Sequence, residues 1–189
     1  MRQNPERRTA LIDAAIEVLA AQGARGLTFR AVDQQAGVPI GTASNYFASR
    51  DALLVQAGER VFEKLDPNTA PMPADLPRTR ESVDRAMHAM VERITAYPSG
   101  YLAVLELRLE STRRPELREV LTGQIRGHFQ KDLDLHRKAG LPGDEQAMTL
   151  LYLALAGLIV ERLTLPDFLG PETVDPLITA LVERVVPGD

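Results

Sequence analysis

The stretch Gly26–Leu54, GLTFRAVDQQAGVPIGTASNYFASRDALL, contains the side chains with the most informative chemistry in this sequence. Its hydrogen-bonding residues lie close together: Thr42, Ser44, Asn45 and Tyr46. Asn can bind adenine through two hydrogen bonds, and Thr can contact a phosphate or the methyl group of thymine. Gly41 has no side chain, so the backbone there can approach a phosphate or a base edge. These residue types predict a surface that binds double-stranded DNA.

The apolar spacing around these residues predicts two short helices, at 29–36 and from Pro39 to about Phe47, with a tight turn at Gly37 between them. Thr28 is placed to cap the first helix, and proline fits the first position of the second. Ser49 is placed to cap a longer helix that runs to about Leu65. This arrangement is typical of a helix-turn-helix, whose second helix enters the major groove.

The rest of the chain also has helical spacing of its apolar residues. A first helix carries Leu11, Ile12, Ala15, Val18 and Leu19 on one face and stops at Gly23. Further helices are expected at about 83–97, 100–114, 115–140, 144–165 and 174–185. The sequence therefore predicts an all-α protein of about nine helices, with no convincing strand.

The segment 66–77, DPNTAPMPADLP, contains four prolines in twelve residues. Proline lacks an N–H and restricts the residue before it, so this segment is expected to be a linker. The predicted domains are a helix-turn-helix DNA-binding domain over 1–65 and a helical effector-binding and dimerisation domain over 78–189.

The composition excludes several classes of protein. With 189 residues and 44% hydrophobic side chains, the chain can bury a core. It has no cysteine, so a disulfide framework and a thiol nucleophile are excluded. His88, His128 and His136 have no metal-ligand spacing, and no Ser-His-Asp group, phosphate loop or dinucleotide motif is present. We expect no catalytic residue, no metal and no cofactor, and therefore no enzyme.

The chain has no apolar segment of the kind that signal peptides need near its start. Its longest apolar stretch, 147–160, is shorter than the ~20 residues that span a bilayer. These features predict a cytoplasmic protein without a membrane partner.

The formal net charge of −4 is unexpected for a protein that binds DNA. Residues 1–60 carry seven Arg against six Asp and Glu, which gives +1, and residues 61–189 carry −5. The asymmetry has the sign that DNA binding requires but is small. We expect operator binding that is salt-sensitive and that depends on a few well-placed groups.

The N-terminal segment resembles regulators of the tetracycline-repressor (TetR) type. The motif residues that carry the resemblance are Thr28-Phe29-Arg30, Ala36-Gly37-Val38, Gly41-Thr42, Tyr46-Phe47 and Ser49-Arg50-Asp51-Ala52-Leu53. The similarity covers about Arg7–Leu54, a quarter of the chain. Ser44 departs from the family pattern, which often has an aromatic residue there, and Pro39 stands where a Ser cap is common.

The resemblance implies an all-helical homodimer in which three N-terminal helices bind DNA and the remaining helices enclose an effector pocket. It places Thr28, Thr42 and Tyr46 on phosphates, with Arg50 at the usual lysine position of the motif. It places Gly41, Ser44 and Asn45 nearest the base edges. The predicted DNA-binding set also contains Arg30, Pro39 and Ile40.

Two further sets of residues are predicted in the C-terminal part. The candidate effector-binding residues are Met87, Met90, Tyr101, Leu105, Glu106, Leu109, Phe129 and Tyr152, with ordinary core packing as the alternative for each. The candidate dimer interface is Leu151, Leu155, Leu158, Leu177, Leu181 and Val185, with burial within one chain as the alternative. Glu106 and Glu110 lie four residues apart, which suits either a ligand site or a salt-bridged helix face.

The sequence thus predicts a ligand-responsive homodimeric transcriptional repressor. It would bind a palindromic operator and be released by an apolar or amphipathic small molecule. The alternatives are a helical ligand-binding or adaptor module that does not bind DNA, and a small helical enzyme, which the missing catalytic group argues against.

Overall fold

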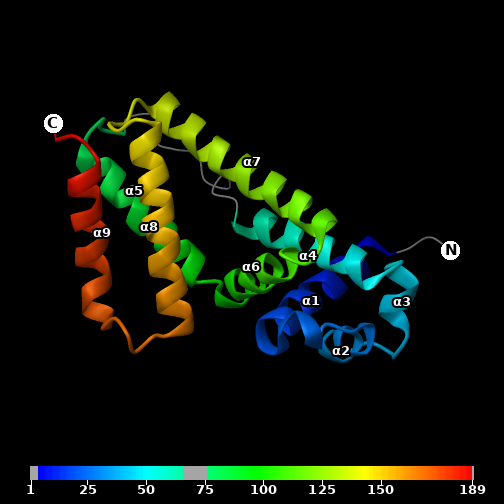
Figure 1. Ribbon diagram of the computed structural model, residues 1–189. Coiled ribbons are helices and arrows are strands. Elements are labelled where there is room, and N and C mark those ends of the chain that lie inside the picture. Colours follow the sequence, from blue (N-terminus) through cyan, green and yellow to red (C-terminus); the bar gives the residue numbers. More distant parts are fainter. Residues whose placement is uncertain (1–3, 66–75, 189) are drawn as a thin grey trace. The chain divides into compact units, whose positions relative to one another are not determined.

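The computed structural model describes residues 4–65 and 76–188, so most of the predicted linker lies outside the described residues. In the described part, the chain forms nine α-helices and no strand (Figure 1), which confirms the all-α prediction. The helices are α1 (Pro5–Gly26), α2 (Phe29–Gln35), α3 (Thr42–Tyr46), α4 (Arg50–Leu65), α5 (Arg80–Thr95), α6 (Pro98–Ser111), α7 (Pro115–Ala139), α8 (Glu145–Thr164) and α9 (Pro171–Val185).

Local sequence signals account for several of the helix ends. The Thr28 hydroxyl accepts a hydrogen bond from the Ala31 N–H at 3.1 Å, and the Ser49 hydroxyl accepts one from the Ala52 N–H at 3.1 Å, as the sequence predicts. Gly37, with φ +65°, ends α2 in the left-handed region that glycine adopts readily. Gly23 interrupts α1 with φ 70° and ψ 178°, so the regular helix breaks at the predicted residue.

The helices form two compact units. The first comprises the described residues 4–65 together with 97–127, and the second comprises 76–96 together with 128–188. Residues 97–127 belong to the first unit because α6 packs against α1 and α4, where Ala103 and Leu107 are fully buried. The sequence places this segment in the C-terminal domain instead. The assignment of 78–189 to effector binding and dimerisation stays a prediction.

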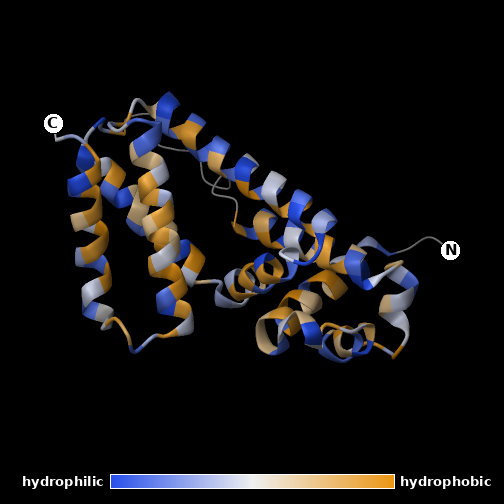
Figure 2. Cartoon of the chain, in the orientation of Figure 1, coloured by the Kyte–Doolittle hydropathy of each residue, from blue (hydrophilic) through white to orange (hydrophobic). Residues whose placement is uncertain are grey.

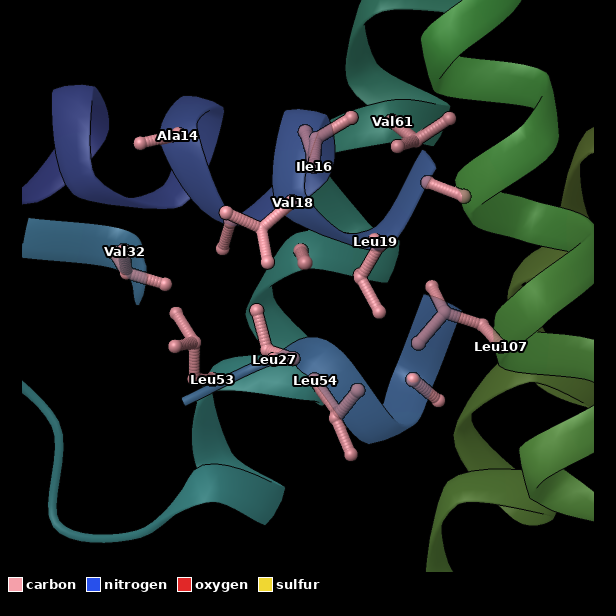
Figure 3. Packing of buried hydrophobic residues seen from close by; sticks show 14 of the residues in the cluster. Ala14, Ile16, Val18, Leu19, Leu27, Val32, Leu53, Leu54, Val61 and Leu107 are labelled. Carbon is pink, nitrogen blue, oxygen red and sulfur yellow. The ribbon is translucent and has the colours of Figure 1, made fainter. Parts of the chain in front are cut away.

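The first unit is held together by apolar side chains from α1, α2, α3, α4, α6 and the first half of α7, and from the connection between α1 and α2. Figure 3 shows Leu19 of α1, Leu54 of α4 and Leu107 of α6 in this core, with Leu27 from the connection. These four leucines are almost completely buried, and each such leucine contributes about 1.5–3 kcal/mol to folding. This core holds α2 and α3 in place on the other helices of the first unit.

The second unit is built from α5, α8 and α9, which pack against one another, and the second half of α7. Its buried residues include Val83, Leu151, Leu155, Ile159 and Ile178. Helix α8 is hydrophobic along most of its length (Figure 2). One of its faces is buried, and a second face that is not buried also carries apolar residues. Leu150 and Leu153 on α8 are exposed.

Candidate nucleic-acid interface

Helices α2 and α3 are joined by a short turn that contains two glycines with positive φ. Gly37 has φ +65° and Gly41 has φ +95°. Helix α3 begins at Thr42, so the prediction that Pro39 opens this helix is wrong. The left-handed backbone of Gly41 interrupts the helical geometry, and the Thr42 N–H closes a turn onto the Pro39 carbonyl at 3.1 Å.

A buried carboxylate fixes the start of α3. Asp33 of α2 is 0% exposed, and its two oxygens accept hydrogen bonds from the backbone N–H groups of Gly41 and Ala43, each at 2.7 Å. These bonds satisfy N–H groups that a helix N-terminus leaves without a partner in its own helix. Asp33 therefore sets the position of α3 relative to α2.

The sequence contains a signal for Asp33 that the prediction missed. Asp33 lies four residues after Phe29 and three before Ala36, which places it on the apolar face of its helix. A carboxylate on that face must be paired when it is buried, so it should have been expected to bind backbone donors.

Arg8 joins three parts of the first unit. Its Nε and Nη2 atoms donate to Gln56 Oε1 at 3.1 and 2.8 Å, and its Nη1 atom donates to the Tyr46 carbonyl at 2.8 Å. The guanidinium carbon lies 4.8 Å from the centre of the Phe47 ring. Arg8 thus connects α1 with α4 and with the end of α3. The sequence offers no periodicity or motif that would have identified it.

The small polar residues of α3 donate to backbone carbonyls directly before the helix in this structure. The Thr42 hydroxyl donates to the Pro39 carbonyl at 2.5 Å, and the Ser44 hydroxyl donates to the Gly41 carbonyl at 2.8 Å. The Asn45 Nδ2 atom donates to the same Gly41 carbonyl at 3.0 Å. Each group is exposed or half-exposed, so it can reach solvent. The Thr42 and Ser44 hydroxyls must exchange this bond before they can donate to DNA, whereas the Asn45 amide has a second N–H and an acceptor oxygen.

The remaining predicted DNA-binding residues are placed differently. Thr28, Arg30, Pro39 and Ile40 are exposed, while Tyr46 packs partly against the core. Arg50 donates from Nε to the Leu27 carbonyl at 2.9 Å and from Nη2 to the Ala24 carbonyl. Two donors of the guanidinium therefore hold the C-terminal end of α1, and the expected contribution of Arg50 to DNA binding stays a prediction.

The predicted effector-binding residues divide between the two units. Tyr101, Leu105, Glu106 and Leu109 belong to the first unit, and Met87, Met90, Phe129 and Tyr152 belong to the second. In the second unit, the rings of Phe129 and Tyr152 lie with their centres 5.1 Å apart, and Met87 is buried. In the first unit, Leu109 is 61% exposed, so the expectation that it lines an enclosed pocket is not supported within its own unit.

The two glutamates of α6 have structural partners. Glu106 accepts a hydrogen bond from the Ala24 N–H at 2.9 Å, directly after the break in α1 at Gly23. Glu110 forms an ion pair with Arg114 at 2.6 Å, which confirms the salt-bridge alternative for this residue. The hydrogen bond from Arg114 lowers the pKa of Glu110 below its ordinary value. Both carboxylates therefore already have a partner within the protein.

The predicted dimer interface contains two residues that face the interior. Leu151 and Leu155 are 0% exposed within the second unit, so the prediction is wrong for both of them. They pack with α5 and α9 on the buried face of α8 and cannot meet a second chain. Leu177 is exposed, and Leu158, Leu181 and Val185 are partly exposed. Leu150 and Leu153 of α8 are exposed as well, although they are not in the predicted set.

The three histidines have no shared site. Among the described residues, no group of three or more His, Asp or Glu side chains has the arrangement of a metal site. His88 Nε2 lies 3.2 Å from the Thr179 hydroxyl, and His136 Nε2 lies 3.2 Å from the Gly143 carbonyl. Both interactions join parts of the second unit.

Comparisons with known proteins agree with this arrangement. Residues 11–57 match the family described as bacterial regulatory proteins, tetR family, and residues 78–188 match the tetracyclin repressor-like C-terminal domain. The HTH-type transcriptional regulator BetI of Rhizobium meliloti is 28% identical over 141 residues, covering 75% of this chain and 69% of that protein.

A second relative matches about a third of the chain. The HTH-type transcriptional repressor KstR of Mycolicibacterium smegmatis is 39% identical over 64 residues, which are 34% of this chain and 31% of that protein. Among solved structures, the multidrug binding protein EbrR in complex with ethidium is 26% identical, with a TM-score of 0.70 and coverage of 96% of this chain and 99% of that chain.

The two family matches together cover most of the chain, and the relatives are transcriptional regulators, not enzymes. The chain belongs to the TetR family of bacterial transcriptional regulators and is a repressor-type regulator with an N-terminal helix-turn-helix and a C-terminal helical domain.

Proposed function

We propose that this protein is a homodimeric repressor that binds a palindromic operator in the cytoplasm and is released by a small apolar or amphipathic molecule. The observation that carries the DNA-binding part is the helix-turn-helix at 29–46, in which the buried Asp33 carboxylate fixes the start of α3. A buried charge that binds two backbone donors gives α3 one defined position. That rigidity is what a helix needs to place side chains in the major groove.

The exposed apolar surface of α8 and α9 supports the homodimer. Leu150 and Leu153 are 49% and 60% exposed, and Leu177 is 44% exposed. Exposed leucines on two helices that pack against each other favour burial against a second copy. Helix α8 is also long and apolar enough to be considered as a membrane span, although its buried face is occupied by α5 and α9. A dimer explains the exposed leucines without requiring a membrane.

The small-molecule response is supported by the second unit and by one relative. Met87, Phe129 and Tyr152 provide flexible and aromatic side chains of the kind that line apolar ligand sites. EbrR, which resembles this chain over nearly its whole length, has been solved with ethidium bound. Ethidium is therefore the first probe, and a rise in the unfolding temperature of the DNA-free protein is the expected result.

The DNA-binding part is tested with an operator obtained by selection from random duplexes. The double variant Thr42→Ala, Tyr46→Phe removes two hydroxyl groups predicted to contact phosphate while keeping the aromatic ring that packs on the core. We expect operator affinity to fall by about tenfold or more, because each hydrogen bond to a charged group is worth roughly 1.5–3 kcal/mol.

The matched control makes the same two changes in the second unit, as Thr149→Ala with Tyr152→Phe. This control should keep the operator affinity of the unmodified protein. Equal affinities for both double variants, with both still dimeric, would show that the helix-turn-helix does not bind the operator through these hydroxyls.

A further inference from the structure

Ile40 is a large aliphatic side chain that is exposed to solvent in the helix-turn-helix. It lies in the turn between α2 and α3, directly before Gly41, and is 58% exposed. Within the described residues 4–65, it is the only large hydrophobic side chain that is exposed. Val38, two residues earlier in the same turn, packs against the core, whereas Ile40 does not. The fold of the first unit therefore does not explain an isoleucine at this position.

The polar neighbours of Ile40 direct their hydrogen atoms to the backbone. Thr42 donates to the Pro39 carbonyl, and Ser44 and Asn45 both donate to the Gly41 carbonyl. For the two hydroxyls, donating to a base edge would require breaking these local bonds, because each hydroxyl has one hydrogen. The Asn45 amide has a second N–H and an acceptor oxygen besides the bond to Gly41. An apolar contact from Ile40 requires no such exchange, because its side chain already faces solvent.

The location of Ile40 suits a contact with a base. In a helix-turn-helix, the residues at the N-terminal end of the second helix contact base edges in the major groove. Ile40 lies two residues before the first residue of α3. The apolar group that B-DNA presents in the major groove is the C5 methyl of thymine. An exposed isoleucine at this position is chemically suited to that methyl group and to no hydrogen-bonding feature of a base.

We propose that Ile40 contacts a thymine methyl group in each operator half-site and is a specificity-determining residue of this repressor. The inference rests on the proposed function, because it requires that α3 enters the major groove. It adds that an apolar contact made by the turn, in addition to the polar residues of α3, selects the half-site sequence.

The test replaces thymine by deoxyuridine, which lacks only the C5 methyl group. Each thymine of the selected operator is replaced in turn, and the dissociation constant is measured by fluorescence anisotropy. Loss of one buried methyl contact weakens binding by about fourfold, and replacement in both half-sites weakens it by roughly fifteenfold. We expect one thymine position per half-site to show this effect with the unmodified protein.

Three variants assign the effect to a side chain. Ile40→Ser should bind the thymine and deoxyuridine operators equally, while Ile40→Val, which retains two methyl groups, should keep part of the preference. Thr42→Ser removes the other methyl group near this position and should keep the full preference. Because Ile40 is exposed, Ile40→Ser should unfold at the same temperature as the unmodified protein.

The outcomes separate this inference from the proposed function. If selection recovers an operator but no deoxyuridine replacement weakens binding, the contact does not exist and the repressor function stands. If Ile40→Ser keeps the preference, or Thr42→Ser alone abolishes it, another side chain makes the contact. If selection enriches no sequence at all, the proposed function fails and the inference fails with it.

Discussion

Asp33 helps to position the predicted DNA-binding helix α3, although its own side chain is buried. Its carboxylate is fully buried and binds two backbone N–H groups at the start of α3. A carboxylate has no hydrogen to donate, so both of its oxygens can accept bonds from N–H groups. An amide group at this position would direct its own N–H at one of these donors.

We predict that Asp33→Asn lowers the free energy of unfolding by about 1–3 kcal/mol, because one buried backbone donor loses its partner. Operator affinity should fall as well, since α3 is no longer held in one position. Denaturant titration and operator binding by the same protein measure both effects. The control is Asp167→Asn, which makes the same change at an exposed position. If the two variants are equally stable, the two Asp33 bonds do not stabilise the protein.

Replacement of Gly41 and of Gly127 by alanine should change the stability of the protein in opposite directions. Neither has an atom within 4 Å of an added Cβ, so only the backbone conformation differs. Gly41→Ala should destabilise the protein by about 1–2 kcal/mol, because φ +95° is unfavourable for alanine. Gly127→Ala, inside α7, should stabilise it by about 0.5–1 kcal/mol. Thermal unfolding checks both changes, and a stabilising Gly41→Ala would contradict the assigned turn geometry.

At this scale the sequence identified the residues of the helix-turn-helix but not their partners. The glycine at position 37 and the caps at Thr28 and Ser49 were predictable because each depends on the local chain alone. The partners of Arg8 and Arg50 were not, since both side chains bind backbone carbonyls distant in sequence. Such contacts depend on tertiary packing, which periodicity does not reveal.

A carboxylate of α6, that of Glu106, forms a hydrogen bond with the backbone at the break in α1. Glu106 accepts a hydrogen bond from the Ala24 N–H at 2.9 Å, and an added Cβ on Gly23 would lie 3.0 Å from the same carboxylate oxygen. The C-terminal end of α1 then leads directly into the connection to α2. The position of α2 therefore depends in part on α6.

We predict that Glu106→Ala lowers the free energy of unfolding by about 1–3 kcal/mol, because the Ala24 N–H is buried and loses its partner. Hydrogen exchange at Ala24 should become faster in this variant. Glu119→Ala, at an exposed position of α7, is the matched control and should stay within about 0.5 kcal/mol of the unmodified protein. Unchanged exchange at Ala24 would show that Glu106 does not hold this end of α1.

Ion pairs in the first unit make its stability dependent on pH. Burial raises the pKa of Asp13, but hydrogen bonds from Lys64 and Arg60 outweigh this effect and hold that pKa below its ordinary value of 3.8. The hydrogen bond from Arg114 similarly holds the pKa of Glu110 below 4.5. Groups with a lowered pKa in the folded state stabilise it above their ordinary pKa.

The stabilisation by these two carboxylates should therefore be complete above about pH 5 and be lost as the pH falls through and below their ordinary pKa values. The double variant Asp13→Asn, Glu110→Gln should be less stable at pH 7 and should lose less stability between pH 7 and pH 3. Denaturant titrations at a series of pH values measure this difference. Parallel curves for the two proteins would mean that neither ion pair stabilises the fold.

At the scale of elements, the sequence predicted the helices well because most of them carry a regular apolar face. The exception is the start of α3, where Pro39 is suitable for a first helical position but Gly41 adopts a left-handed conformation. The buried hydrogen bonds from Gly41 and Ala43 to Asp33 favour that conformation. The conformation at the start of α3 therefore depends on Asp33, a residue of another helix.

For the whole molecule, the exposed leucines of α8 and α9 are expected to bind a second copy. We predict that Leu153→Asp produces a monomer at micromolar concentration, because a charge would be buried at the centre of an apolar interface. Leu109→Asp is the matched control, since Leu109 is exposed to nearly the same extent, 61% against 60%, and lies in the first unit. Sedimentation velocity should show a dimer for this control, and two dimeric variants would exclude α8 from the interface.

The exposed face of α8 could be predicted only in part from the sequence. Helix α8 is apolar on more than one face, so periodicity cannot distinguish the face that meets α5 and α9 from the face that remains exposed. For this reason the predicted interface contains Leu151 and Leu155, which are buried, and lacks Leu150 and Leu153, which are exposed. The small positive charge of residues 1–60 remains consistent with binding that depends on placed groups.

Selection from random DNA duplexes by the full chain tests the central claim most directly. A homodimeric repressor with one helix-turn-helix in each subunit should enrich an inverted repeat whose half-sites are about one helical turn, or a multiple of it, apart. Binding to that site should weaken steeply as salt concentration rises. Enrichment of a sequence without two-fold symmetry, or of no sequence at all, would contradict the account.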